Sequence, residues 1–265
     1  MKIKKLFTFL IIFTCLFSCS ILQKKHSASV NEILPMDSFT FIKKTLIVRS
    51  CFQNVCSGKE FRSAGSGVAV AQNKLGTYVV TAGHICEDSP YPENSGLTSS
   101  SKYEILNMAG EKNSAEVVTS ALKDKDGVDI CMLFAAGVYI EPVKIAANKP
   151  KAGDKIYNLA APYSIGQPGA VPILEGRYIG EIAKNTFAYS VPAAPGSSGS
   201  GMFNTKGELV GVLYAVYWRF HNISLANEFY IMKEFIHNSV RKYNKILDVD
   251  QDKIDIPLNR LLPKF

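Results

Sequence analysis

Three short stretches of the sequence place reactive side chains beside apolar runs that are typical of strands. His84 follows "TYVVTAG", Asp129 precedes "ICMLF", and Ser198 lies in the small-residue turn "PGSSGSG". A serine hydroxyl is a weak nucleophile at neutral pH and needs a base, and imidazole is suitable when a carboxylate fixes its tautomer. If the fold brings them together, these side chains could cleave an acyl bond, with Ser198 as nucleophile, His84 as base and Asp129 as its partner.

The turn around Ser198 also suits the stabilisation of a negatively charged intermediate. Gly196 and Gly199 allow a sharp turn without a Cβ in the way. The backbone N–H groups of Gly196 and Ser198 could then point at one oxygen and form an oxyanion hole. Ser197 and Ser200 are rival nucleophiles, but only Ser198 has a glycine two residues before it and another directly after it.

Other residues are candidates for the acid and for the base. Asp124 and Asp126 lie close to Asp129, but only Asp129 leads directly into an apolar run. An α/β-hydrolase would need Gly-x-Ser-x-Gly on a strand-to-helix turn, with its acid and histidine later in the chain. The second glycine is absent here and a strand is expected after the turn, so His221 and His237 are weaker candidates for the base.

The rest of the sequence, which must position these side chains, reads as many short strands. About a dozen segments rich in β-branched and aromatic residues are separated by Gly, Pro, Asn and Asp. Only Ile231–Leu247 has helical spacing, with one face formed by Ile231, Phe235, Ile236, Val240 and Tyr243. This pattern indicates a β-barrel or β-sandwich, and the polar segment Ala147–Lys155 is expected to be a hinge between two barrels.

The motifs resemble those of trypsin-like serine peptidases, most closely the bacterial HtrA-type branch. The family order His, Asp, Ser is kept. The similar segments are Thr81–Cys86, Asp129–Leu133 and Gly196–Gly199, together with Gly65–Val68, Gly153–Tyr157 and Gly207–Val212. The resemblance covers about residues 42–240, and no PDZ-like segment is expected after it.

The resemblance implies an all-β fold of two six-stranded antiparallel β-barrels with a C-terminal α-helix. We expect a peptidase domain at residues 39–248, with barrels at about 39–148 and 149–230 and the helix at about 231–247. The implied activity is that of a serine endopeptidase, which cleaves polypeptides through an acyl-enzyme. Its triad would be His84, Asp129 and Ser198, and its oxyanion hole would use Gly196 and Ser198.

The sequence departs from the family pattern just after the nucleophile. Ser200 stands where the family has glycine, and Gly201 stands where it has proline. Serine at position 200 would lower activity if the backbone there needed a positive φ. The alternative hypothesis is therefore a binding module on a peptidase fold with weak or no turnover.

The stretch before the nucleophile bears on substrate preference. "SVPAAPG" has no acidic residue where relatives specific for basic side chains keep one, and "VLYAVYW", on the other expected wall, is apolar. We expect a small or aliphatic residue on the acyl side of the cleaved bond.

The first residues are typical of an export signal. Three lysines precede an apolar run of about a dozen residues, which is too short to span a bilayer comfortably. Leu16–Cys19 resembles a bacterial lipoprotein cleavage box, with Cys19 as the lipid-attachment residue. We expect a signal peptide at 1–18, a tether at 19–38 and a tail at 249–265. The protein is expected in the cell envelope, anchored to a membrane through the lipid and facing the periplasm from the outer membrane.

Charge and cysteine content narrow the remaining possibilities. Removal of residues 1–18 takes three lysines and leaves 27 basic and 23 acidic residues, a net charge of +4. No cluster of basic residues indicates a nucleic-acid partner. The predicted chemistry needs no cofactor or metal, and no further residues at metal-ligand spacing accompany His84 and Cys86.

Four cysteines follow Cys19 in the sequence. Cys51 and Cys56 could form a disulfide across a hairpin, although four cysteines allow three pairings and Cys131 could be a buried apolar residue.

Overall fold

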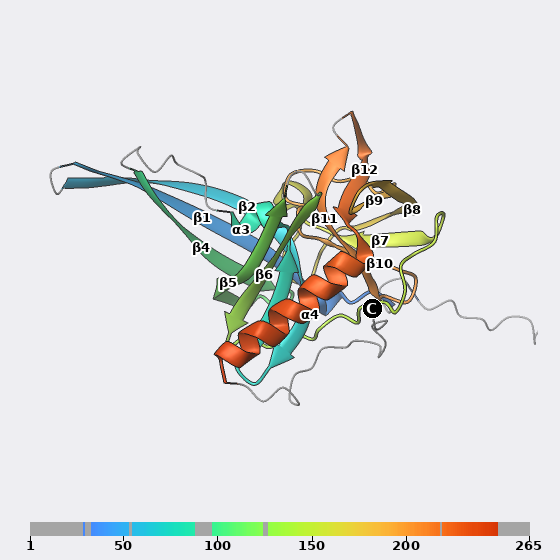
Figure 1. The fold of residues 1–265 in the computed structure, drawn as a ribbon, viewed down its shortest axis with the longest axis horizontal. Coiled ribbons are helices and arrows are strands. Elements are labelled where there is room, and N and C mark those ends of the chain that lie inside the picture. Colours follow the sequence, from blue (N-terminus) through green and yellow to red (C-terminus); the bar gives the residue numbers. More distant parts are fainter. Residues whose placement is uncertain are drawn as a thin grey trace, which may run out of the picture. The chain divides into compact units, whose positions relative to one another are not determined.

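The computed structural model describes residue 29 and residues 33–52, 55–87, 97–123, 127–217 and 219–248. From Leu34 onward these residues belong to one compact unit, which holds two closed six-stranded barrels and a C-terminal helix (Figure 1). The fold predicted from the sequence is confirmed. The predicted signal peptide, Cys19, the tail, and the rival acids Asp124 and Asp126 lie outside the described residues.

The first barrel closes because apolar residues on alternate strand positions point inward. Ile42, Val79 and Leu133 are among its fully buried residues. Its strands, in the order in which they pair, are β1 (Phe39–Phe52), β2 (Val55–Asn73), β3 (Gly76–Thr81), β6 (Val128–Ala136), β5 (Lys112–Lys123) and β4 (Leu97–Asn107). Strands β1, β2 and β4 extend well beyond the others (Figure 1).

The second barrel has an aromatic core. The ring of Tyr178 packs 5.1 Å from that of Phe187 and 5.3 Å from that of Tyr189. Its strands, again in pairing order, are β10 (Gly201–Phe203), β11 (Leu209–Tyr217), β12 (Phe220–Asn227), β9 (Thr186–Tyr189), β8 (Ile173–Ala183) and β7 (Lys155–Leu159). All pairings between these strands are antiparallel.

Helix α4 (Phe229–Ile246) follows the second barrel in sequence and packs against β11 of that barrel and against β5 and β6 of the first. Its N-terminus is capped by Glu228, whose carboxylate accepts from the amides of Tyr230 and Ile231. Near its C-terminal end, Asn244 accepts hydrogen bonds from Asn73 at 2.6 Å and from Tyr78 at 3.0 Å. Buried polar contacts of this kind fix the helix on the outer side of β3. Among the described residues, no helix is long and apolar enough to cross a membrane.

The first barrel contains disulfide-bonded cysteines. Cys86 and Cys131 form a disulfide with a Cα–Cα distance of 6.3 Å, so the interpretation of Cys131 as a mere apolar residue is wrong. Cys56 is also disulfide-bonded and lies opposite Cys51 in the register of the β1–β2 hairpin. This register is the one that the predicted hairpin disulfide requires.

Candidate active site

His84 and Asp129 both belong to the first barrel and contact each other. His84 lies on the four-residue helix α3 (Gly83–Cys86), which follows β3, and Asp129 is the second residue of β6. The Nδ1 atom of His84 lies 2.8 Å from Oδ2 of Asp129, and the backbone amide of His84 donates to Oδ1 at 3.0 Å. Because the carboxylate accepts at Nδ1, the other ring nitrogen, Nε2, is left free to act as a base.

A glycine allows this close approach between the two strands. A Cβ on Gly83 would lie 2.7 Å from the carbonyl oxygen of Ala121 and 3.0 Å from Oδ1 of Asp129. Any larger residue before His84 would therefore push α3 away from the carboxylate. The histidine side chain is 36% exposed and that of Asp129 only 14%, so the base faces the solvent while its partner is covered.

Asn227 positions the carboxylate, although the sequence analysis did not single it out. Its side-chain oxygen accepts from the amide of Asp129 at 2.9 Å, and its side-chain nitrogen donates to the carbonyl of Asp129 at 2.8 Å. Asn227 ends β12, is completely buried, and so ties the second barrel to the start of β6. No signal in the sequence marks this residue, because its partner lies 98 positions away.

The turn that holds Ser198 is bound to the first barrel through Ser66 of β2. The amide of Ser66 donates to the carbonyl of Ser198 at 2.8 Å, and its hydroxyl donates to the carbonyl of Gly196 at 2.8 Å. The same hydroxyl accepts from the amide of Ala161 at 3.1 Å. Ser66, fully buried, thus joins the nucleophile turn to the barrel that carries His84 and Asp129.

Close packing places the turn beside the chain around His84. A Cβ on Gly199 would lie 2.1 Å from the hydroxyl oxygen of Thr81, three residues before His84. The position of a Cβ on Gly65 would be 3.0 Å from the side chain of Ile85 and 3.2 Å from the carbonyl oxygen of Ser198. The fold therefore places the Ser198 turn next to the segment that carries His84.

The backbone of the turn presents free amides. Gly196 and Gly199 have φ values of +96° and +87°, which favour glycine. The carbonyl of Pro195 accepts from the amide of Tyr163 at 2.6 Å, and a trans peptide directs its N–H opposite to its C=O. The amide of Gly196 therefore points away from Tyr163. Within the part of the chain that the structure describes, neither this amide nor that of Ser198 is bonded to an acceptor.

The two other serines of the turn, Ser197 and Ser200, are not accessible to a substrate. Ser197 and Ser200 are completely buried, whereas Ser198 is partly exposed. The hydroxyl of Ser200 accepts from Asn158 at 2.8 Å, and its φ is not positive, so the strain considered for this departure from the family pattern is absent. Gly201 begins β10 at a point where a Cβ would lie 2.5 Å from the ring of Phe203.

Ser198 lies on the wall of a pocket with a volume of about 600 Å³. The other lining residues are uncharged: Tyr163, Ala193, Ala194, Pro195, Leu213, Tyr214, Ala215 and Val216. Burial raises the pKa of Tyr214 above its ordinary value, and the charge of Asp129 adds to the rise, so the phenol stays neutral. An uncharged lining agrees with the predicted preference for a small or aliphatic side chain.

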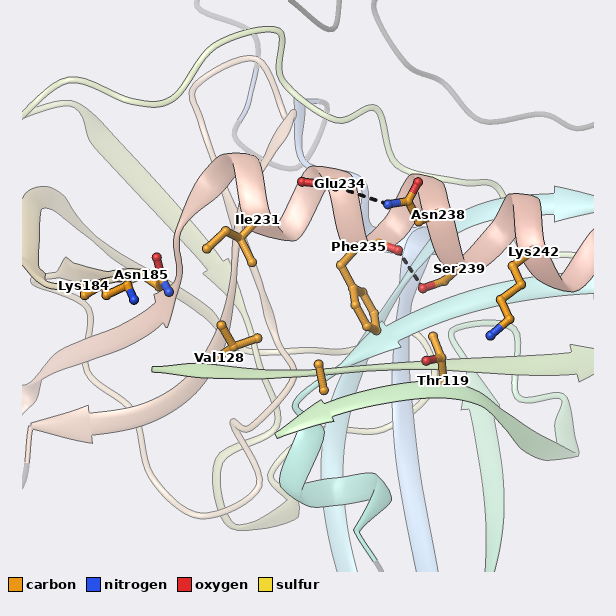
Figure 2. A pocket seen from close by; sticks show the side chains of 11 residues that line it. Thr119, Val128, Lys184, Asn185, Ile231, Glu234, Phe235, Asn238, Ser239 and Lys242 are labelled. Carbon is orange, nitrogen blue, oxygen red and sulfur yellow. Dashed lines mark hydrogen bonds between the residues drawn. The ribbon is translucent and has the colours of Figure 1, made fainter. Parts of the chain in front are cut away.

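A different pocket, of about 460 Å³, lies between α4 and strands β5 and β6 (Figure 2). Figure 2 shows Ile231 and Phe235 of α4 above Val128 and Thr119, and the lining includes neither His84 nor Ser198. It is therefore separate from the pocket that Ser198 lines.

Two closed six-stranded antiparallel β-barrels, with the Ser198 turn bonded to the first barrel, are the architecture of two-barrel serine peptidases. Residues 65–212 match the trypsin-like peptidase domain family, and the chain belongs to this family. No curated protein sequence matches the chain significantly.

Solved structures of serine proteases have the same fold. The serine endoprotease from Yersinia pestis superposes with a TM-score of 0.58 at 18% sequence identity, over 82% of this chain and 68% of that one. An HtrA-type protease, AlgW, solved as a variant with a decapeptide, gives a TM-score of 0.62 at 14% identity, over 81% and 67% of the two chains. The predicted family and the likeness to HtrA-type proteases in fold are confirmed.

Proposed function

We propose that this trypsin-like peptidase is a serine endopeptidase that cleaves polypeptides through an acyl-enzyme. His84 accepts the proton of the Ser198 hydroxyl while the oxygen attacks the carbonyl carbon of the substrate. The resulting oxyanion is bound by the amides of Gly196 and Ser198. His84 then gives the proton to the leaving amine, and water, activated by the same imidazole, releases the acyl group from Ser198.

The observation that carries this proposal is the 2.8 Å contact between His84 and Asp129 beside the Ser198 turn. The carboxylate keeps the imidazole in the tautomer that can accept a proton, and stabilises the imidazolium that forms. The unbonded amides of Gly196 and Ser198 add support, because the N–H donors of an oxyanion hole must be available to bind the substrate oxygen. The unstrained backbone at Ser200 favours an active enzyme over the alternative of an inactive binding module.

Reaction with a fluorophosphonate probe tests the proposal. We expect the purified protein to be labelled once, on the peptide that contains Ser198, because only an activated serine attacks the probe. Ser198→Ala should abolish labelling and should lower cleavage of unfolded casein by at least about 1000-fold. Ser197→Ala is the matched control and should keep both. An adduct on another serine, or a fully active Ser198→Ala variant, would refute the assignment.

The location in the cell envelope is a separate proposal, which rests on the leader sequence alone. Cys19→Ser should remove the lipid and move the protein from the membrane fraction to the soluble fraction of cells. A variant that stays with the membrane would show that Cys19 is not the anchor.

A further inference from the structure

A second cleft lies on the first barrel, over strands β1, β2 and β4, and carries an excess of positive charge. It has a volume of about 570 Å³, and its walls include Lys43, Arg62, Ala64, Glu104, Lys112 and Ser164. We name it the basic cleft. Ser164 in its wall directly follows Tyr163, which lines the Ser198 pocket, so the two hollows adjoin.

Strand β2 connects the basic cleft to the nucleophile. Side chains two residues apart on a strand share a face, so Arg62 and Ala64 lie on the same face as Ser66. The hydroxyl of Ser66 bonds to the carbonyl of Gly196 at 2.8 Å, which shows that this face is turned toward the Ser198 turn. Each two-residue step covers about 7 Å, so Ala64 lies about 7 Å and Arg62 about 14 Å along the strand from Ser66.

The neighbouring strands add their charges to the same face. Lys43 of β1 pairs directly with Ala64 of β2 and with Glu104 of β4, and residues opposite each other share a face. Lys43 is exposed and forms no ion pair among the residues that the structure describes. Lys112 is already bound to Glu104 at 2.7 Å.

The two other cations near the basic cleft, Arg62 and Lys44, contact groups of the protein. Arg62 contacts Glu60 at only 3.5 Å, and both side chains are largely exposed, so a substrate carboxylate can replace this partner. Lys44 also lines the cleft, but its ammonium is engaged, because it donates to the carbonyl of Glu87. The groups free to meet a ligand in the cleft are therefore the cations of Lys43 and Arg62.

A polypeptide cut at Ser198 must leave this region in two directions. If the uncharged pocket beside β11 takes one half, the other half runs along the exposed residues Ala64 and Arg62 of β2 and enters the basic cleft. We propose that the basic cleft binds the leaving half of the substrate and selects acidic residues, at about the second to fourth positions after the cleaved bond. This inference rests on the proposed peptidase activity, and on the assignment of the uncharged pocket to the acyl half.

The test uses internally quenched peptides with one constant acyl half and three leaving halves. These carry Glu, Gln or Lys at the second to fourth positions after the cleaved bond. We expect kcat/KM to be at least about tenfold higher for Glu than for Lys at low ionic strength. The ratio should shrink as salt is added, because salt screens exposed charges.

Variants connect the preference to the cleft. Lys43→Glu/Arg62→Glu should invert the Glu-to-Lys ratio, and the milder Lys43→Gln/Arg62→Gln should bring it close to one. Lys74→Glu/Lys151→Glu is the control for charge. It replaces two exposed lysines outside the cleft and changes the net charge by as much as Lys43→Glu/Arg62→Glu does, so it should keep the wild-type ratio. Circular dichroism checks that each variant is folded.

The outcomes separate the inference from the proposed function. If the Gln peptide is cut but Glu and Lys peptides are cut equally, the peptidase stands and the inference fails. The inference also fails if the preference survives the Gln variant, or is lost equally in the Lys74/Lys151 control. If no peptide is cut and the fluorophosphonate leaves Ser198 unlabelled, the proposed function fails and the inference falls with it.

Discussion

Asp129→Asn is expected to lower kcat by about 10⁴-fold while it leaves KM nearly unchanged. The amide oxygen of the substituted side chain can still accept from the backbone of His84, as Oδ1 does now at 3.0 Å. The amide nitrogen would then face Nδ1 of the imidazole, where the carboxylate oxygen lies at 2.8 Å. Because two donors cannot bond to each other, Nδ1 gives up its proton and Nε2 carries it. The ring can then no longer accept the proton of Ser198.

Steady-state kinetics on a peptide with a neutral leaving half measures this effect. Asp154→Asn is the matched control, since Asp154 lies in an exposed turn and its carboxylate accepts from the nearby amide of Lys151; it should keep full activity. Thermal unfolding of both variants shows whether the change is confined to catalysis. Activity of Asp129→Asn within tenfold of the wild type would mean that another group orients His84.

Cys86→Ala/Cys131→Ala is expected to lower the free energy of unfolding by about 4 kcal/mol, the value for a cross-link that closes a loop of this length. The disulfide joins residues 45 positions apart, and both cysteines are buried. It also links the helix that carries His84 to the strand that carries Asp129. We therefore expect the variant to lose activity at temperatures well below those that inactivate the wild type.

Urea unfolding at neutral pH, with and without reductant, measures the effect. With reductant present, the wild type and the double variant should have similar midpoints. Cys51→Ala/Cys56→Ala is the control, since the predicted hairpin pairing closes a much shorter loop and should contribute only about 2 kcal/mol. A loss below about 1 kcal/mol for Cys86→Ala/Cys131→Ala would mean that strand pairing alone holds the two segments together.

The features of the site that depend on a few neighbouring residues could be predicted from the sequence. A histidine after one apolar run, an acid before another and a serine among glycines are each visible within a few residues. Their order matched a known family, so chemistry and fold could be stated together. The preference among Ser197, Ser198 and Ser200 agrees with burial, because the two rivals are enclosed and Ser198 is not.

The parts that could not be predicted depend on long-range contacts. Asn227 holds both backbone groups of Asp129 across 98 positions, and Ser66 bonds to Gly196 across 130. Cys131 sits in an apolar run, and nothing near it in the sequence indicates that Cys86 is its partner. Whether serine at position 200 would strain the backbone likewise depended on its φ value. That value is set by the way β10 pairs with its neighbours.

By itself, then, the amino-acid sequence determined which side chains could react, and which segments would form strands and the final helix. These properties follow from residue type and from periodicity over a few positions. Only the tertiary structure decided which distant residues support the site, which cysteines pair, and that Lys43 and Arg62 share a face with Ser66. The reason is physical: barrel closure sets the register between strands far apart in the chain, and a shift of one residue would turn each of these side chains to the opposite face.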